Sequence, residues 1–204
     1  MIRRVLTAVS DATDDEVSEG LGWYHQAHEH AREIADTYGT TTAQAAGVIA
    51  ALSPQTGWGL NIRLAHDAAD HARHGRTDLI GGHTEDACAK ASRILQGHDP
   101  DDVLGGRKVR SFYANILRPD RPGHVTIDRH ALSLLADDRD ANARILDRAG
   151  VYQRCAAVFR TSATLLTGGG ASLRPHEVQA VAWVHWRNKH DVSRHFNYDP
   201  TEEF

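Results

Sequence analysis

The sequence is poor in cysteine, and its two cysteines, Cys88 and Cys155, lie far apart in the chain. They form no C-x-x-C pair, so neither a four-cysteine iron–sulfur cluster nor a cysteine-based zinc site is available. We expect both thiols to be reduced, as thiols are in the cytoplasm.

Long apolar runs are also missing. No stretch approaches the roughly 18 residues that a membrane-spanning helix needs. The first residues, Met1-Ile2-Arg3-Arg4, lead into no signal-peptide core. We therefore expect a cytoplasmic protein that has no membrane partner.

What is present is a chain of 204 residues, 41% hydrophobic and 25% charged, which is enough to bury a core. Strand-like alternation of useful length is absent, whereas apolar residues recur at helical spacing, so we predict an all-α fold. Val17, Leu21 and Tyr24, for example, begin one apolar stripe, and Gly39 ends it. The predicted helices cover residues 14–38, 41–52, 60–74, 84–96, 107–117, a segment from about 128, 139–148, 151–166 and 175–188.

The net charge of −4 argues against a uniformly basic nucleic-acid binder, but the charge is unevenly distributed. Between residues 107 and 130, cations outnumber acids. The cations are Arg107, Lys108, Arg110, Arg118, Arg121 and Arg129, and the acids are Asp120 and Asp128. Such a segment is typical of a phosphate-facing patch, and the alternative is a solvated basic face.

The most informative stretch runs from Leu104 to His130. The glycine pair Gly105-Gly106 opens a helix whose first-turn N–H groups and dipole suit a phosphate. Lys108 stands at the head of that helix, and Asp128 stands at the head of the next. If the two helix starts meet at one cleft, an amine and a carboxylate face the same ligand.

This stretch resembles the hairpin and catalytic segment of the helix-hairpin-helix DNA glycosylase superfamily. The resemblance implies that Lys108 takes the place of the nucleophilic lysine of bifunctional members, Asp128 that of the aspartate found in nearly all members, and His130 that of the histidine after it. Upstream, Leu52-Ser53-Pro54-Gln55-Thr56 is similar to a segment of endonuclease-III-like members that enters the DNA stack. Gln55 would then fill the space left by a flipped base, with Asn61 nearby.

The resemblance implies an enzyme that excises or modifies a base in duplex DNA carrying a damaged or modified base. Breaking an N-glycosidic bond builds positive charge on the sugar, which a fixed carboxylate at Asp128 would stabilise. Lys108 would act as an amine nucleophile if apolar Phe112 and cationic Arg107 favoured its neutral form. The further DNA contacts are expected from Gly105, Gly106, Arg107, Arg110, Arg129, His130 and Trp58. We expect no cofactor, no bound metal and a monomer.

Two departures from the superfamily pattern stand out. The hairpin glycines are adjacent here instead of separated by one residue, and the cluster cysteines of the endonuclease III branch are missing. The resemblance covers roughly residues 45–136. We therefore predict a divergent branch, such as a phage-type base-modifying relative, in a bacterium or a phage-infected host. Residues 1–190 would form one glycosylase-like domain, with one lobe from the terminal helices and one from about 45–136, followed by a polar tail over 191–204.

Other interpretations remain open at this point. Asp128 is also a good N-cap for the helix that follows it, and the chain could be a catalytically silent binding module that keeps only the hairpin. The chain is rich in histidine, and His25, His28 and His30 with His66 and His71 could supply ligands for an all-helical metal-dependent phosphohydrolase. In the last predicted helix, Gln179, Trp183 and Trp186 share one face, which is typical either of a core or of a base pocket.

Overall fold

The structure is a computed structural model that describes residues 1–76, 82–121, 123–167 and 172–190. Every regular element in these ranges is helical, and no strand occurs in them, so the all-α prediction is confirmed. No helix within the described ranges is both long and apolar enough to cross a bilayer.

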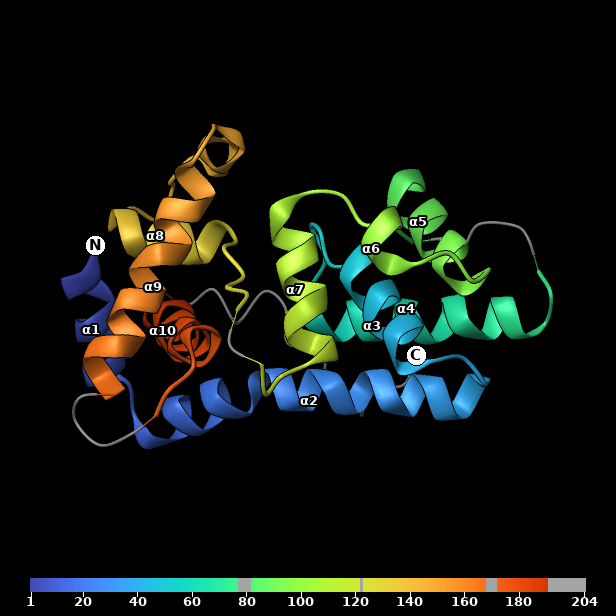
Figure 1. Cartoon of the computed structure of the whole chain (residues 1–204), viewed down its shortest axis with the longest axis horizontal. Helices are drawn as coiled ribbons and strands as arrows, with labels where there is room; N and C mark the ends of the chain where they lie inside the picture. The colour runs from blue at the N-terminus through green and yellow to red at the C-terminus, as the bar shows by residue number, and fades with distance from the viewer. Residues whose placement is uncertain (77–81, 122, 168–171, 191–204) are drawn as a thin grey trace. The chain divides into compact units, whose positions relative to one another are not determined.

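Within the described ranges, ten α-helices and one 3₁₀ helix follow one another along the chain (Figure 1). In order they are α1 (Ile2–Asp11), α2 (Asp14–Tyr38), α3 (Thr42–Ala51), α4 (Trp58–Arg73), α5 (Glu85–Leu95), α6 (Pro100–Val103), α7 (Arg107–Leu117), α8 (Arg129–Ala136), η1 (Ala143–Asp147), α9 (Val151–Thr167) and α10 (Pro175–Lys189).

Most predicted helices are present, and the helices over 14–38 and 107–117 have the predicted bounds. The prediction of an α-helix over 139–148 is wrong, because the only helical segment there is a 3₁₀ helix over Ala143–Asp147. The local reason is a left-handed C-cap at Asp137, with φ of 59°, followed by a turn in which Asp138 accepts from the Asp140 N–H at 3.0 Å. Helices α1 and α6 were not predicted. The predicted glycine joint at 168–170 and the tail from 191 lie outside the described residues.

Contacts divide the chain into two units. Unit 1 comprises Met1–His25 and Arg118–Val192, and unit 2 contains Gln26–Leu117. The division falls within α2, which supplies its first turns to unit 1 and the remainder to unit 2. The predicted lobes, with limits at about 45 and 136, stay a prediction, and each unit is described by itself below.

Unit 1 is organised around α10, which contacts α1, α8 and α9 (Figure 1). Its core holds Phe159, Ile127, Leu135 and Val178, all at most 1% exposed. The start of α2 approaches α10 very closely at Gly20, because a Cβ there would lie 2.5 Å from the Cα of Val181. Any side chain at position 20 would therefore collide with backbone.

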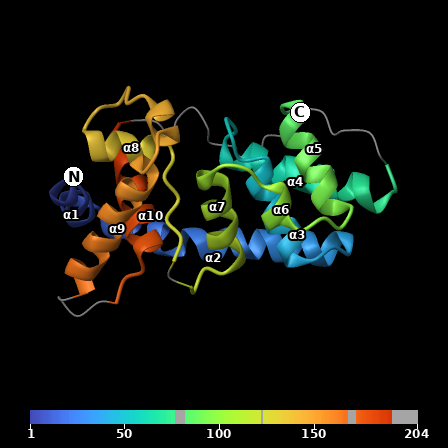
Figure 2. The same cartoon turned by 45° about the horizontal axis from the view of Figure 1, so that its top comes forward.

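Unit 2 is organised around α3, in which all seven residues from Ala45 to Ala51 are buried. Helices α4, α5 and α6 gather around it, and α7 packs on it as well (Figure 2). A capping box starts α3, since Thr41 accepts from the Gln44 N–H and Gln44 accepts from the Thr41 N–H. Gly47 allows Pro100 to approach, because a Cβ at Gly47 would lie 2.9 Å from the Pro100 Cγ.

Candidate active site

Asp128 stands at the end of a short extended segment that leads into α8. The segment Val125–Ile127 is buried, and the Tyr152 hydroxyl of α9 bridges its backbone. That hydroxyl accepts from the Ile127 N–H at 3.1 Å and donates to the Val125 carbonyl at 2.9 Å. The bridge fixes the backbone just before Asp128.

Both carboxylate oxygens of Asp128 accept an N–H. Oδ1 accepts from the Ala131 N–H at 2.8 Å, which makes Asp128 the N-cap of α8. Oδ2 accepts from the indole Nε1–H of Trp183, on α10, at 2.9 Å. The first bond is what an N-cap requires, whereas the second goes beyond capping and fixes the orientation of the carboxylate.

The Trp183 ring belongs to a cluster of aromatic and cationic side chains in unit 1. Trp23, from α2, lies with its ring centroid 5.0 Å from that of Trp183, and His130 lies at 6.4 Å. The Arg187 guanidinium lies 4.3 Å from the Trp183 centroid, in cation–π geometry. Burial lowers the pKa of Arg187, and the negative charges of Asp128 and Glu19 oppose this shift.

This arrangement combines a fixed negative charge with flat apolar faces. A carboxylate has about four lone-pair sites, so two accepted N–H groups leave acceptor capacity for a ligand. Such a site can orient a polar group or stabilise a developing positive charge. Asp128 and Trp183 are both half-buried, so the group retains access to solvent.

The predicted phosphate-binding segment lies in unit 2, at the start of α7. Gly106 has a left-handed backbone with φ of 72°, a conformation that glycine adopts without strain. The Arg110 side chain reaches back over the glycine pair and donates from Nε to the Leu104 carbonyl at 2.7 Å. Arg107 is exposed and Lys108 is half-buried.

The turn that carries Gln55 is also in unit 2. Gln55 is exposed and has a left-handed backbone, with φ of 59°, which is unusual for a residue other than glycine. His83 holds the turn, with Nε2 at 2.9 Å from the Leu52 carbonyl and 2.6 Å from the Thr56 hydroxyl. Because the His83 Nδ1 accepts from the Thr84 N–H at 2.6 Å, the proton of the neutral ring belongs on Nε2.

Two other predicted DNA contacts in unit 2 are partly or wholly withdrawn from the surface. Trp58 packs edge-on against Phe112, with centroids 6.3 Å apart, and against His30 at 6.0 Å. Asn61 is 2% exposed, and its Oδ1 has no hydrogen-bond partner among the described residues. Trp58 and Asn61 are therefore less open to a ligand than Gln55 is, and their contact with DNA stays a prediction.

The structure thus groups the predicted residues by unit. Asp128, Arg129 and His130 lie together at the start of α8 in unit 1. In unit 2 lie the glycine turn with Lys108 and the turn with Gln55. Lys108 belongs to unit 2 and Asp128 to unit 1, so their pairing at one ligand stays a prediction.

Sequence reasoning missed two residues that position the candidates. Trp183 was singled out for its spacing from Gln179 and Trp186, but not as the partner of Asp128, which is 55 residues away. Of those three, Gln179 and Trp186 are buried and Trp183 is half-buried. His83 carried no local signal at all.

The histidines considered as metal ligands have other neighbours. His28 contacts the Ile116 carbonyl at 2.9 Å, and His66 contacts the Tyr38 hydroxyl at 3.3 Å. Among the described residues, no three His, Cys, Asp or Glu side chains are placed to hold a metal ion together. The described residues therefore provide no set of metal ligands for the phosphohydrolase interpretation.

Comparison with known proteins assigns the chain to a family. Residues 1–190 match the family described as "Family of unknown function (DUF7178)". The chain belongs to DUF7178. No curated protein and no solved structure matches it. The match to DUF7178 includes the Asp128 group, the α7 glycine turn and the Gln55 turn, and the glycosylase resemblance remains a prediction.

Proposed function

We propose that this DUF7178 protein acts on a base flipped out of duplex DNA, as an N-glycosylase-like enzyme that excises or modifies the base. The observation that carries the proposal is the double anchoring of Asp128, by the Ala131 N–H at 2.8 Å and the Trp183 indole at 2.9 Å. A carboxylate that only capped a helix would not need the second donor. The proposed role for Asp128 is that of the essential carboxylate.

The proposed reaction needs a fixed negative charge. In hydrolytic excision, the bond from C1′ of the sugar to the base nitrogen breaks and the base leaves with the electron pair. Water adds to C1′, and its proton balances the charge on the departing base. Positive charge develops on the sugar meanwhile, and a carboxylate that is already oriented stabilises it without reorganisation.

The surrounding side chains support the same proposal. Trp183 and Trp23 form an aromatic pair, with centroids 5.0 Å apart, of the kind against which a base withdrawn from the stack can pack. Lys108 is proposed as the amine nucleophile if the enzyme also cleaves the strand, and Gln55 as the residue that fills the gap in the duplex. The left-handed backbone of Gln55 is a conformation that occurs at ligand-contacting turns more often than elsewhere.

The test is to incubate the protein with duplexes that carry a panel of damaged and hypermodified bases. Mass spectrometry then identifies any base that is released or altered. On the responsive substrate, Asp128→Asn is expected to slow turnover by about 100-fold or more, with DNA binding retained. Trp183→Phe keeps an aromatic ring and removes the N–H donor, so we expect a loss of about tenfold.

Asp99→Asn is the matched control for the Asp128 variant. Asp99 is also an N-cap, of α6, and its carboxylate accepts from the Asp101 N–H at 2.9 Å. The control should leave turnover unchanged. If no duplex in the panel is altered and Asp128→Asn binds DNA like the original protein, the proposal is wrong and a silent binding module is the better description.

A further inference from the structure

Unit 1 contains a hollow of about 290 Å³ that the proposed reaction does not use. Its lining consists of Arg129, His130, Arg139, Asp140, Trp186 and His190. Asp128 is not part of this lining, although it precedes Arg129 in the chain. The hollow therefore adjoins the candidate active site, and it shares His130 with the cluster around Trp183.

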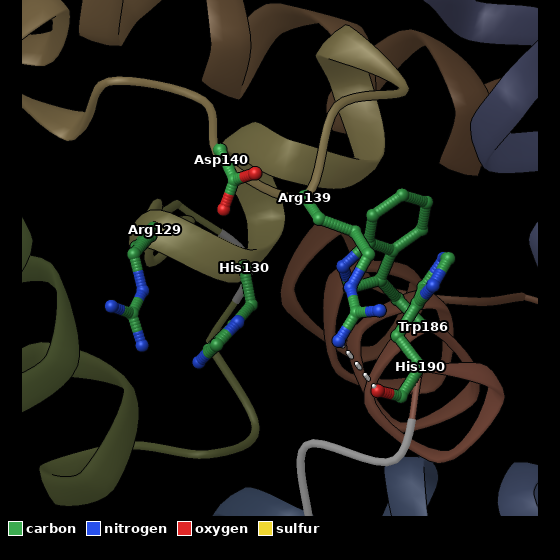
Figure 3. A pocket seen from close by; sticks show the side chains of 6 residues that line it. All are labelled: Arg129, His130, Arg139, Asp140, Trp186 and His190. Atoms are coloured by element: carbon green, nitrogen blue, oxygen red, sulfur yellow. Dashed lines mark hydrogen bonds between the residues drawn. The ribbon is translucent and has the colours of Figure 1, made fainter.

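Three separate segments supply the lining. Arg129 and His130 leave the first turn of α8 on the same side, as Figure 3 shows. Arg139 and Asp140 come from the turn after α8, and Trp186 and His190 come from the end of α10. Residues far apart in sequence thus bring two guanidinium groups and two imidazoles to one place.

One side of the hollow is held in place by contacts of its own. The His190 ring lies 4.0 Å from the Trp186 ring, and Trp186 is only 8% exposed. Arg139 donates from Nη2 to the His190 carbonyl at 3.1 Å (Figure 3). A guanidinium has five N–H donors, so this bond orients Arg139 and leaves donors for a ligand.

The charges around the hollow favour an anion. In the lining, two guanidiniums oppose the single carboxylate of Asp140. Burial, together with the positive charges of Arg139 and Lys189, lowers the pKa of His190, so its neutral ring can serve as a hydrogen-bond partner. Planar guanidiniums match the oxygens of a phosphate especially well.

We infer that this hollow binds a phosphate group, through Arg129 and Arg139. The phosphate would be either a diester of the DNA strand or a monoester carried by a modified base or a strand end. That the phosphate comes from DNA or from a modified base rests on the proposed function. Phosphate binding itself can be measured without DNA.

The experiment uses the full chain with ¹⁵N-labelled indoles, since the four tryptophans give few signals to assign. Dimethyl phosphate represents the diester, and methyl phosphate represents the monoester. We expect a saturable shift of the Trp186 signal, while the signal of Trp58, in unit 2, stays in place. The ester that binds more tightly identifies the source.

Matched variants show whether the hollow is the site. Arg139→Gln and Arg129→Gln should each weaken binding by about tenfold. Arg129→Gln keeps the assay informative if loss of the Arg139 contact disturbs the fold. Asp140→Asn removes the opposing charge and should tighten binding. Arg3→Gln makes the same charge change on an exposed part of α1 and should have no effect.

The inference is overturned if neither ester shifts the Trp186 signal saturably. It is also overturned if both Arg129→Gln and Arg139→Gln bind like Arg3→Gln. Failure of the proposed function is seen separately, because ester binding is measured without DNA, whereas base release is measured on the duplexes. Ester binding without base release on any duplex would leave the phosphate site standing and remove the glycosylase proposal.

Discussion

Unit 1 and unit 2 present their candidate residues in opposite ways. In unit 1, the Asp128 carboxylate already accepts two hydrogen bonds from its own unit, at 2.8 and 2.9 Å. In unit 2, Gln55 is exposed on a turn, and what is held there is the backbone around it, by His83. The arrangement in unit 1 fixes the orientation of the Asp128 carboxylate, whereas the arrangement in unit 2 leaves the Gln55 side chain exposed to solvent.

The contrast separates two tasks that the proposed activity on DNA would require. Stabilising a transition state depends on groups that do not reorganise, which is the condition that Asp128 meets. Recognition depends on side chains that meet a partner from outside, which suits Gln55 and the exposed Arg107. We therefore expect substitutions in unit 1 to affect stability and turnover, and substitutions in these parts of unit 2 to affect DNA binding.

The largest effect should come from Gly20, one of two glycines at close helix contacts. A Cβ at Gly20 meets the backbone of Val181 at 2.5 Å, whereas a Cβ at Gly47 meets the side chain of Pro100 at 2.9 Å. Backbone cannot move aside without shifting α10, so Gly20→Ala should cost roughly 3 kcal/mol of unfolding free energy. Gly47→Ala should cost less, about 1–2 kcal/mol, because the Pro100 ring must shift while alanine favours the helix. Urea unfolding measures both.

Gly105→Ala is the control for this pair, since nothing lies within 4 Å of a Cβ at Gly105. It should change the stability by less than about 0.5 kcal/mol. Equal losses for Gly20→Ala and Gly47→Ala would contradict the difference that we draw between backbone and side-chain contact.

An intermediate effect is expected from acid, and it should arise in unit 1. Burial lowers the pKa of His176 from 6.5, so the unfolded chain takes up a proton that the folded chain refuses. Burial alone would raise the pKa of Glu16, but hydrogen bonds from His185, the Thr13 N–H and Asn188 lower it below 4.5. Stability should therefore fall as the pH drops below about 6.5, and fall further below about 4.5.

Glu16→Gln tests the second stage. It should cost about 1–2 kcal/mol at pH 7, where the Glu16 carboxylate accepts from His185 at 2.9 Å. The difference from the original protein should vanish toward pH 3. His176→Gln should flatten the first stage, between about pH 7 and pH 5. A pH profile that both variants share with the original protein would rule out these two groups as the cause.

The smallest effect on stability is expected at the Gln55 turn. Gln55→Gly relieves the left-handed backbone at φ of 59°, so unfolding free energy should rise by up to about 1 kcal/mol or stay level. If the Gln55 side chain fills the gap in the duplex, the same variant should bind a substrate duplex more weakly. Gln55→Ala should lose binding equally and be less stable than Gln55→Gly. Binding that survives both changes would remove Gln55 from the DNA interface.

Periodicity predicted the helices whose apolar stripe is long. The helix over 14–38 has the predicted bounds because its stripe is continuous and Gly39, with φ of 72°, stops it. By contrast, α1 buries only Val5 and Ala8, too few residues for a recognisable pattern. The 3₁₀ segment was mistaken for a helix because its turn is set by side-chain bonds of Asp138 and Asn142, which periodicity does not register.

The candidate site was predictable only where its signal is local. Asp128 precedes a segment whose apolar residues, Ala131, Leu132, Leu134 and Leu135, recur at helical spacing, so its N-cap role is visible in the sequence, and the structure confirms that cap. The hydrogen bond between Asp128 and Trp183 depends on how α8 and α10 pack. Gln55 precedes α4 in the sequence and His83 follows it, so only folding brings His83 to the Gln55 turn. Contacts of this kind follow from tertiary packing, which a single sequence does not specify by spacing.

The Tyr152 hydroxyl takes the place of a neighbouring strand, because every regular element described in this unit is helical. By accepting from Ile127 and donating to Val125, it provides the pair of bonds that a strand would exchange with its partner. Tyr152 therefore sets the register of residues 125–127. A slip of one residue would place Ile127 or Arg129 at the head of α8 and leave the Trp183 indole facing the wrong side chain.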